Sequence, residues 1–175
     1  MLFVSLLVLA ACEPIPPAPQ TPSTLATAPT PALNGPAEDL SKACVLFDKS
    51  CTVGWADGCY NLGVARYEGK GVPKDTALAA TLFTKACEEI AEACTNLGAL
   101  HIQGDGAPKD VVKAAQLFTR ACDRGSALGC SNLGFAYFHG SGVERDLTKA
   151  EQLFTKACQA GVQRGCDNLK FIPGH

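Results

Sequence analysis

Apolar residues recur along the chain with the spacing of an amphipathic α-helix. Four segments, at 43–51, 79–87, 114–122 and 150–158, share this pattern, and all end in cysteine. In each of them an alanine, a Leu-Phe pair and a second small residue fall at positions i, i+3, i+4 and i+7, which form one stripe on a helix. Their final cysteines are 36, 35 and 36 residues apart. The pattern therefore predicts one helix in each of four repeats.

A second set of helical segments follows the first. Its copies begin at Cys59, Cys94, Cys130 and Cys166. The first three read Cys-x-Asn-Leu-Gly, whereas the fourth has lysine in place of the glycine. A loop with two glycines follows each intact copy, where glycine is expected to end the helix in the left-handed conformation. Each loop closes with an aspartate that is expected to cap the next helix, namely Asp75, Asp110 and Asp146. A repeat is thus predicted to contain two helices, joined by a glycine loop and followed by a short turn.

Glycine also occurs inside the predicted second-set helices, at Gly63, Gly98 and Gly134. At such a position glycine destabilises a helix by about 1 kcal/mol relative to alanine. We therefore interpret these glycines as places where neighbouring helices approach closely. The last copy stops at Leu169 and is followed by Phe171, which predicts a truncated final helix that acts as a cap.

Together, three recurring motifs resemble the Sel-1-like repeat, a relative of the tetratricopeptide repeat. They are Asn-Leu-Gly, Gly-x-Gly-Val-x-x-Asp and Lys-Ala-x-x-Leu-Phe-x-Lys-Ala-Cys, and they recur from about Asp39 to Leu169. The added cysteine pair in each repeat is similar to that of a cysteine-rich subgroup of secreted bacterial proteins. The resemblance implies an all-α fold, a right-handed α/α solenoid of disulfide-stapled helical hairpins, whose concave surface serves protein interaction. It also implies an alternative, because some members are described as penicillin-binding proteins or weak β-lactamases.

The chain contains ten cysteines, a number typical of proteins in oxidising compartments. Eight of them form local pairs around a helix-to-helix turn: Cys51 with Cys59, Cys87 with Cys94, Cys122 with Cys130, and Cys158 with Cys166. An antiparallel hairpin can bring the α-carbons of each pair within the roughly 4.4–6.8 Å that a disulfide requires. We predict four structural disulfides, each contributing roughly 2.5 kcal/mol. Since the Cys87–Cys94 pair is one residue closer and its turn has no glycine, we predict this bridge to be the most easily reduced.

Other roles for the cysteines have little support in the sequence. Zinc sites use closer cysteine pairs, combined with a second pair or with histidines, and the spacing here differs. The histidines are scattered, at His101, His139 and His175. We predict neither a metal nor a cofactor. Cys44 is left over, at a position that other copies fill with Ala80, Ala115 and Glu151, and we predict a buried or half-buried free thiol there.

The N-terminus resembles a lipoprotein signal. Residues 2–11 form an apolar run with the length of a signal-peptide core, and Leu9-Ala10-Ala11-Cys12 resembles the lipobox, which implies a lipid on Cys12. Glu13 is compatible with sorting to the outer membrane. We expect a bacterial cell-envelope protein, an outer-membrane lipoprotein that faces the periplasm or the exterior. The alternative is an ordinary secretory signal and a secreted protein, in which case Cys12 could pair with Cys44.

Three parts of the chain are predicted: a signal peptide at 1–11, a Pro/Ala/Thr-rich disordered tether at 12–38, and a domain of about four repeats at 39–175. The formal charge is −2, from 15 basic and 17 acidic residues that are interspersed, which argues against nucleic acid as a partner. A serine β-lactamase site requires Ser-x-x-Lys and a Lys-Thr-Gly element, and the sequence contains neither. The sequence therefore favours a binding protein over an enzyme.

Positions that vary among the repeats are candidates for partner recognition, because positions that are identical in every copy serve the scaffold. Two such columns lie near the ends of the second-set helices, with an apolar residue between them. The first column contains Arg66, His101 and Tyr137, and the second contains Glu68, Gln103 and His139. We predict that they line a groove that binds a peptide or protein partner in the envelope or outside the cell.

Overall fold

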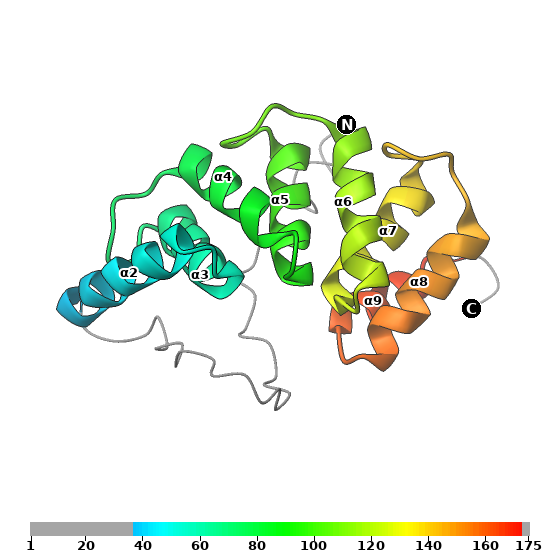
Figure 1. Ribbon diagram of the computed structural model, residues 1–175. Coiled ribbons are helices and arrows are strands. Elements are labelled where there is room, and N and C mark those ends of the chain that lie inside the picture. The colour runs from blue at the N-terminus through cyan, green and yellow to red at the C-terminus, as the bar shows by residue number, and fades with distance from the viewer. Residues whose placement is uncertain (1–36, 173–175) are drawn as a thin grey trace. The chain divides into compact units, whose positions relative to one another are not determined.

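The computed structural model describes residues 37–172, and this part of the chain contains eight α-helices and no β-strand (Figure 1). The helices are α2 (Ala37–Thr52), α3 (Ala56–Glu68), α4 (Thr76–Ala86), α5 (Ala91–Gln103), α6 (Val111–Asp123), α7 (Ala127–His139), α8 (Leu147–Gln159) and α9 (Gln163–Leu169). We call α3, α5, α7 and α9 A helices, and α2, α4, α6 and α8 B helices. The predicted signal peptide and most of the predicted tether lie outside the described residues. Helix α2 begins two residues before the predicted boundary at residue 39.

The helix ends coincide with the predicted capping residues. Each of the three long A helices ends at a glycine with positive φ, which is 74° at Gly69, 72° at Gly104 and 68° at Gly140. Glycine adopts this left-handed conformation without a steric penalty. Before α4, α6 and α8, an aspartate side chain accepts a hydrogen bond from the backbone N–H three residues later, at 2.9, 2.9 and 3.0 Å. The predicted helix stops and starts are therefore confirmed.

The mid-helix glycines Gly63, Gly98 and Gly134 of the A helices each lie against a phenylalanine ring of the following B helix. A Cβ added to Gly63 would lie 2.7 Å from Cε1 of Phe83, and one added to Gly98 would lie 2.6 Å from Cε1 of Phe118. The same relationship joins Gly134 to the ring of Phe154, at 2.8 Å. Because these distances are shorter than any normal carbon–carbon contact, only glycine lets the two helices approach so closely. The predicted close packing is confirmed.

The second glycine of each loop has a role that the sequence did not reveal. Gly71, Gly106 and Gly142 all have φ between 71° and 74°. A Cβ on Gly106 would collide with the backbone carbonyl of Thr76, and one on Gly142 would collide with that of Val111. Each loop therefore rests on the first turn of the preceding B helix. At one such contact the Thr76 hydroxyl donates a hydrogen bond to the Asp105 carboxylate, at 2.8 Å.

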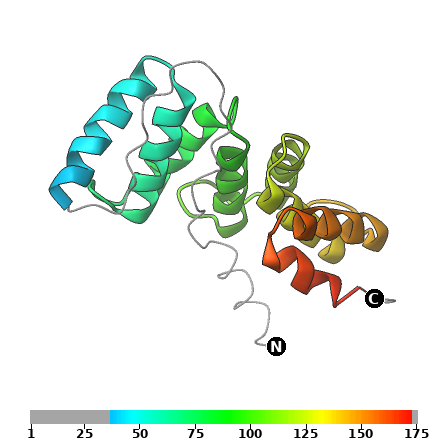
Figure 2. The same ribbon diagram turned by 90° about the horizontal axis from the view of Figure 1, so that it is seen from below.

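The core is a series of apolar clusters that follow the order of the chain. The first cluster is built mainly from α2 to α5, the second mainly from α6 and α7, and the third from α8 and the residues after α9. Each helix packs most closely against its neighbours in sequence, and the A helices α5 and α7 also touch each other. Figures 1 and 2 show the hairpins following one another in this order. The described part of the chain is an all-α solenoid, as predicted.

The C-terminal end of the described solenoid is formed by the short helix α9 and by the residues that follow it. Helix α9 has only seven residues, as the broken last copy predicts. Lys170 takes the position that glycine occupies in the other A helices. Beyond it, the side chain of Ile172 is buried in a cluster with Ala150 and Phe154. Ile172 thus packs against the phenylalanine of α8, the last B helix among the described residues.

Candidate functional site

Four disulfides frame the A helices. They join Cys51 to Cys59, Cys87 to Cys94, Cys122 to Cys130, and Cys158 to Cys166, with Cα–Cα distances of 4.5, 4.6, 4.4 and 4.7 Å. Each bond connects the end of a B helix to the first turn of the next A helix. The pairs are those that the spacing of the cysteines predicts. Because every A helix is tied at its first turn, the direction in which its side chains project is fixed by the scaffold.

Cys44 is the one free cysteine of residues 37–172, and its side chain is buried. Its thiol donates a weak hydrogen bond to the carbonyl oxygen of Lys70, at 3.5 Å. Burial raises the pKa of this thiol, and the charge of Arg66 opposes the rise. A buried thiol with a raised pKa is poorly reactive. Cys12, the predicted site of lipid attachment, lies outside the described residues.

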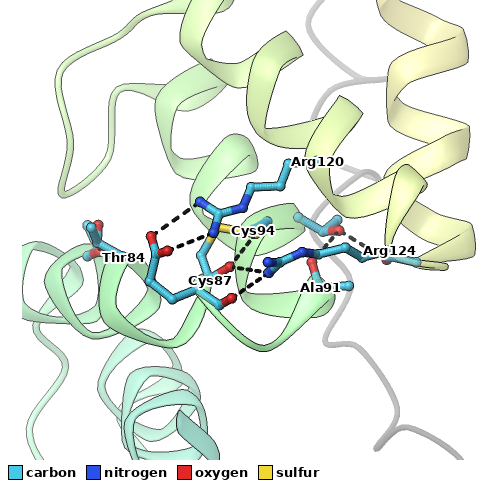
Figure 3. Close-up of a disulfide and its surroundings, with 10 residues drawn as sticks. Thr84, Cys87, Ala91, Cys94, Arg120 and Arg124 are labelled. Carbon is cyan, nitrogen blue, oxygen red and sulfur yellow. Dashed lines mark hydrogen bonds and ion pairs between the residues drawn. A yellow bond between two sulfur atoms is a disulfide. The ribbon is translucent and has the colours of Figure 1, made fainter. Parts of the chain in front are cut away.

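Arg120 on α6 and Arg124, the C-cap residue that follows α6, hold the turn that contains the Cys87–Cys94 disulfide (Figure 3). The Arg124 guanidinium donates to the carbonyl oxygens of Cys87 and Glu88, at 3.0 and 2.6 Å. Arg120 forms a two-pronged ion pair with the Glu88 carboxylate, at 2.8 and 3.2 Å. The hydrogen bond from Arg120 is the main cause of the lowered pKa of Glu88. An open depression of about 660 Å³ lies beside this turn, and Arg124 lines it, but its guanidinium is already bound to the turn.

The first predicted recognition column holds the loop of its own repeat. The Arg66 guanidinium donates to the carbonyl oxygen of Pro73, at 3.3 Å. His101 makes the equivalent bond to Pro108, at 2.8 Å from Nδ1, and only 5% of this residue is exposed. Since a carbonyl oxygen can only accept, Nδ1 of His101 carries the hydrogen. Tyr137 is half-buried, with Nζ of Lys149 5.2 Å from the ring centroid. This column therefore braces the repeats rather than presenting an open surface.

The second predicted column is more accessible. Glu68 and Gln103 are half-buried, and His139 is exposed. The Glu68 carboxylate forms an ion pair with Lys70, at 2.8 Å. The His139 ring stacks on Phe135, with the ring centroids 4.2 Å apart. Partial burial lowers the pKa of His139, and the charge of Arg145 lowers it further.

Two further columns share the accessible side of the A helices, and sequence reasoning missed them. The asparagine of the Cys-x-Asn-Leu motif is half-buried in every copy, and the residue three positions later is half-buried in the three intact copies. Positions i, i+3 and i+7 lie on one side of a helix. We define the open face as these three columns: Asn61, Val64 and Glu68 on α3; Asn96, Ala99 and Gln103 on α5; and Asn132, Phe135 and His139 on α7.

The open face continues from one A helix to the next through Tyr60. Tyr60 on α3 lies beside the side chain of Asn96 on α5, so that α3 and α5 approach each other at the asparagine column. Burial raises the pKa of Tyr60 to about 12, and the Glu92 carboxylate adds to the rise. Tyr60 is therefore a neutral phenol under physiological conditions.

The chemistry beside the asparagines changes along the open face. Four residues before each asparagine the copies carry Asp57 on α3, Glu92 on α5 and Leu128 on α7, and all three side chains are at least partly exposed. On α7, Leu128 is followed on the same side by Phe135 and His139. The face is thus acidic on α3 and α5 and becomes apolar and aromatic on α7.

The fold and the disulfides define a class of protein, the cysteine-rich α/α repeat proteins. The Sel1 repeat family matches the sequence at residues 56–89, 91–126 and 127–162, which together make up more than half of the chain. The chain belongs to the Sel1 repeat family. Within residues 37–172, the three matched repeats are flanked by the B helix α2 and by the A helix α9.

Three solved structures of bacterial proteins are similar to this chain. A protective antigen present in uropathogenic Escherichia coli strains, which displays an SLR fold, has a TM-score of 0.73 and 32% identity over 77% of this chain and 29% of its own. The Sel1 repeat protein from Oxalobacter formigenes has a TM-score of 0.69 and 29% identity over 75% and 54%. Helicobacter pylori cysteine-rich protein B has a TM-score of 0.61 and 29% identity over 78% and 98%. This chain thus spans about a third and about half of the first two proteins. No curated protein matches the sequence.

Membership of this family indicates a scaffold for protein–protein interaction. The four disulfides and the cysteine-rich neighbour indicate an extracytoplasmic protein. Between residues 37 and 172, no helix is long and apolar enough to cross a membrane. The same range contains no group of His, Cys, Asp and Glu side chains that could hold a metal ion.

Proposed function

We propose that this protein is a cell-envelope scaffold that binds a peptide or protein partner along the open face of its A helices. The observation that carries the proposal is that a side chain constant in every copy, the asparagine, lies beside columns that vary from copy to copy. A constant column can recognise what all peptides share, their backbone amides, whereas the varying columns can select side chains. The two properties together are those of a recognition surface.

Asparagine suits the first task because its amide both donates and accepts hydrogen bonds, as a peptide group does. The three intact copies place Asn61, Asn96 and Asn132 on successive A helices of the described solenoid. Their helices are tied by a disulfide in the first turn and end at a left-handed glycine, so little conformational entropy is lost when a partner binds. An extended peptide can therefore form hydrogen bonds with a series of preformed amide groups.

The varying columns indicate the chemistry of the partner. Asp57 and Glu92 favour a basic side chain beside α3 and α5, and Phe135 favours an apolar side chain beside α7. The preferred partner is thus a segment with at least one lysine or arginine near one end and an apolar residue near the other. His101 is buried, so its part in this function is to hold the loop at Pro108.

Peptides selected on the purified protein from a random displayed library provide a probe. We expect Asn96→Ala and Asn132→Ala each to weaken the binding of a selected peptide by about tenfold, which is the effect of one or two lost hydrogen bonds. Gln116→Ala is the matched control, because it removes an exposed amide from the B helix α6. Equal affinities for all three variants would refute this location of the binding surface.

We further propose that the protein is anchored by a lipid on Cys12, after cleavage of the signal at residue 11. The supporting observations are the lipobox-like sequence and the extracytoplasmic character of the disulfide-bonded repeats. Intact mass of membrane-extracted protein should show the acyl groups and one alkylatable thiol, that of Cys44. A mass without acyl groups and no free thiol would instead support a Cys12–Cys44 disulfide and a secreted protein.

The alternative of a penicillin-binding protein or weak β-lactamase is supported only by the resemblance to the cysteine-rich family. Incubation of the purified protein with a chromogenic cephalosporin tests it. Turnover that survives substitution of the open face would show an activity separate from partner binding. If no turnover is seen, the hydrolase alternative is removed.

A further inference from the structure

Large apolar side chains are exposed together at the N-terminal end of the solenoid. Val45 and Leu46 on α2 are 54% and 60% exposed, and Val53 and Trp55 in the turn after α2 are 72% and 50% exposed. We call these four residues the N-terminal face. Within residues 38–172 only two other large apolar residues are exposed, Val112 and Phe171. Trp55 is the single tryptophan of the chain.

The other copies show what this type of face contacts. Leu82 occupies the position of Leu46 in the next B helix, and it is only 5% exposed because it lies in the cluster formed with α2 and α3. Leu117 packs against the same cluster, and Leu153 packs against the cluster of α6 and α7. In each later copy, therefore, the leucine is covered by the preceding helical hairpin.

The residues of the turn after a B helix also contact the preceding helical hairpin. Arg124 occupies the position of Val53, and its guanidinium binds the carbonyl oxygens of the preceding turn. Ser126 occupies the position of Trp55, and its hydroxyl is 3.1 Å from that of Thr95 on the preceding A helix. The N-terminal face thus has the form of a contact between repeats, yet its turn positions carry apolar side chains in place of these polar ones.

The C-terminal end of a second copy is a poor match for this face. Between repeats, the phenylalanine of a B helix lies over a glycine of an A helix. In the last copy that glycine is replaced by Lys170, which follows α9, and the adjoining apolar space is filled by Ile172. A head-to-tail chain of copies is therefore disfavoured, and the remaining self-contact is one N-terminal face against another.

Helix α2 has the charge pattern of a self-complementary helix. Its first turn is acidic, with Glu38 and Asp39, and its last turn is basic, with Lys49. Residues 39 and 49 are centred on residue 44, beside the exposed Val45 and Leu46. In an antiparallel pair of α2 helices with Asp39 of each copy opposite Lys49 of the other, Leu46 lies opposite the exposed Lys42, and the Val45 and Leu46 side chains of the two copies lie within about one helical turn of each other.

We propose that the N-terminal face is a self-association surface, on which two copies of the protein pack with their α2 helices antiparallel. The contact is isologous, so it closes at two copies and leaves the open faces of both solenoids accessible to partners. Because one helix from each copy forms the contact, the association is weak, with a midpoint on the order of micromolar concentration.

Sedimentation equilibrium of the full chain, from about 1 μM to about 200 μM, tests the proposal. We expect the average mass to rise from one copy to two for the wild type and for the control Val112→Glu, which changes an exposed valine outside the face. Leu46→Glu should remain a single copy. Circular dichroism checks that the variants fold, which is expected because Leu46 is already exposed.

A charge reversal tests the antiparallel arrangement independently. Lys49→Glu alone should shift the midpoint at least about fivefold towards higher concentration, and adding Asp39→Lys should restore it. A wild-type protein that stays a single copy throughout would overturn the proposal, as would equal effects of Leu46→Glu and Val112→Glu. Binding of lipid vesicles through Leu46 by a protein that never dimerises would overturn it in favour of a membrane-facing role.

Discussion

The ring of Phe118 lies directly over Gly98, so that a single methyl group on the glycine would come within 2.6 Å of the ring carbon Cε1. The contact explains why a residue that weakens helices occurs in the middle of α5. It also recurs in each full repeat, between Gly63 and Phe83 and between Gly134 and Phe154. In each repeat, therefore, the phenylalanine ring of the B helix occupies the space that a side chain on the A helix would need, and this contact holds the two helices together.

Substitution of Gly98 by alanine separates helix propensity from packing, because the two effects change the free energy of unfolding in opposite directions. If only helix propensity mattered, Gly98→Ala would stabilise the protein by about 1 kcal/mol. We expect it instead to destabilise the protein by about 2 kcal/mol, because the ring of Phe118 has to move. Urea unfolding measures the change. In the double variant with Phe118→Leu, the loss should be smaller than the sum of the two single losses, and strict additivity would contradict the contact.

Two buried serines make a matched pair. Ser126 caps α7 through the N–H of Gly129, at 3.2 Å, and contacts the Thr95 hydroxyl. Ser131 is 1% exposed, and its hydroxyl has no hydrogen-bond partner among the residues that the structure describes. We expect Ser126→Ala to cost about 2 kcal/mol, one for the cap and one for the lost hydrogen bond. Ser131→Ala should be neutral or stabilising by up to about 1 kcal/mol. Thermal or urea unfolding of both variants tests this, and equal losses would be inconsistent with it.

The disulfides are expected to differ in their resistance to reduction. Cys87 and Cys94 are 2% and 0% exposed, and α6 covers their turn through Arg124, whereas Cys158 and Cys166 are half-buried at the end of the solenoid. Since a thiolate has to reach a sulfur atom, we expect Cys158–Cys166 to be reduced first by a limiting amount of dithiol. Alkylation followed by peptide mass mapping gives the order. This order differs from the one that the sequence predicts, because the burial of Cys87 and Cys94 is not visible in the sequence. Prior reduction of Cys87–Cys94 would show that its shorter, glycine-free turn outweighs its burial.

Tyr60 links stability to alkaline pH. Its pKa in the folded protein is raised to about 12 by burial and by Glu92, against about 10 in an unfolded chain. The folded state thus holds this proton more tightly, so the corresponding stability is complete below about pH 10 and is lost as the pH rises towards 12, by about 2–3 kcal/mol. Tyrosinate absorbance should show one tyrosine titrating late, and Tyr60→Phe should flatten the fall in stability. An unchanged pH dependence in that variant would contradict the assignment.

Much of the fold could be predicted because its determinants are local and repeated. The cap at Asp110, the αL glycine at Gly104 and the spacing of each cysteine pair depend on residues close in sequence. The role of Gly106 could not be read in this way, since it depends on the backbone of Thr76 in the preceding repeat. A motif shows that glycine is required there, but only the three-dimensional contact shows why.

The candidate site was only partly predictable, because variation between copies is not the same property as accessibility. Arg66 and His101 differ in chemistry, and yet both bind the carbonyl oxygen seven residues later, so the column varies while its structural role stays the same. The asparagine column was missed for the converse reason. Asn96 is constant and was therefore assigned to the scaffold, although it remains partly exposed beside a variable column.

Nuclear magnetic resonance can follow partner binding by the open face residue by residue. When a selected peptide is titrated into the ¹⁵N-labelled protein, we expect the largest shifts in the side-chain amides of Asn61, Asn96 and Asn132 and in the backbone of α3, α5 and α7. Shifts confined to the B helices α4, α6 and α8, with the three asparagine amides unmoved, would mean that the partner binds elsewhere on the solenoid.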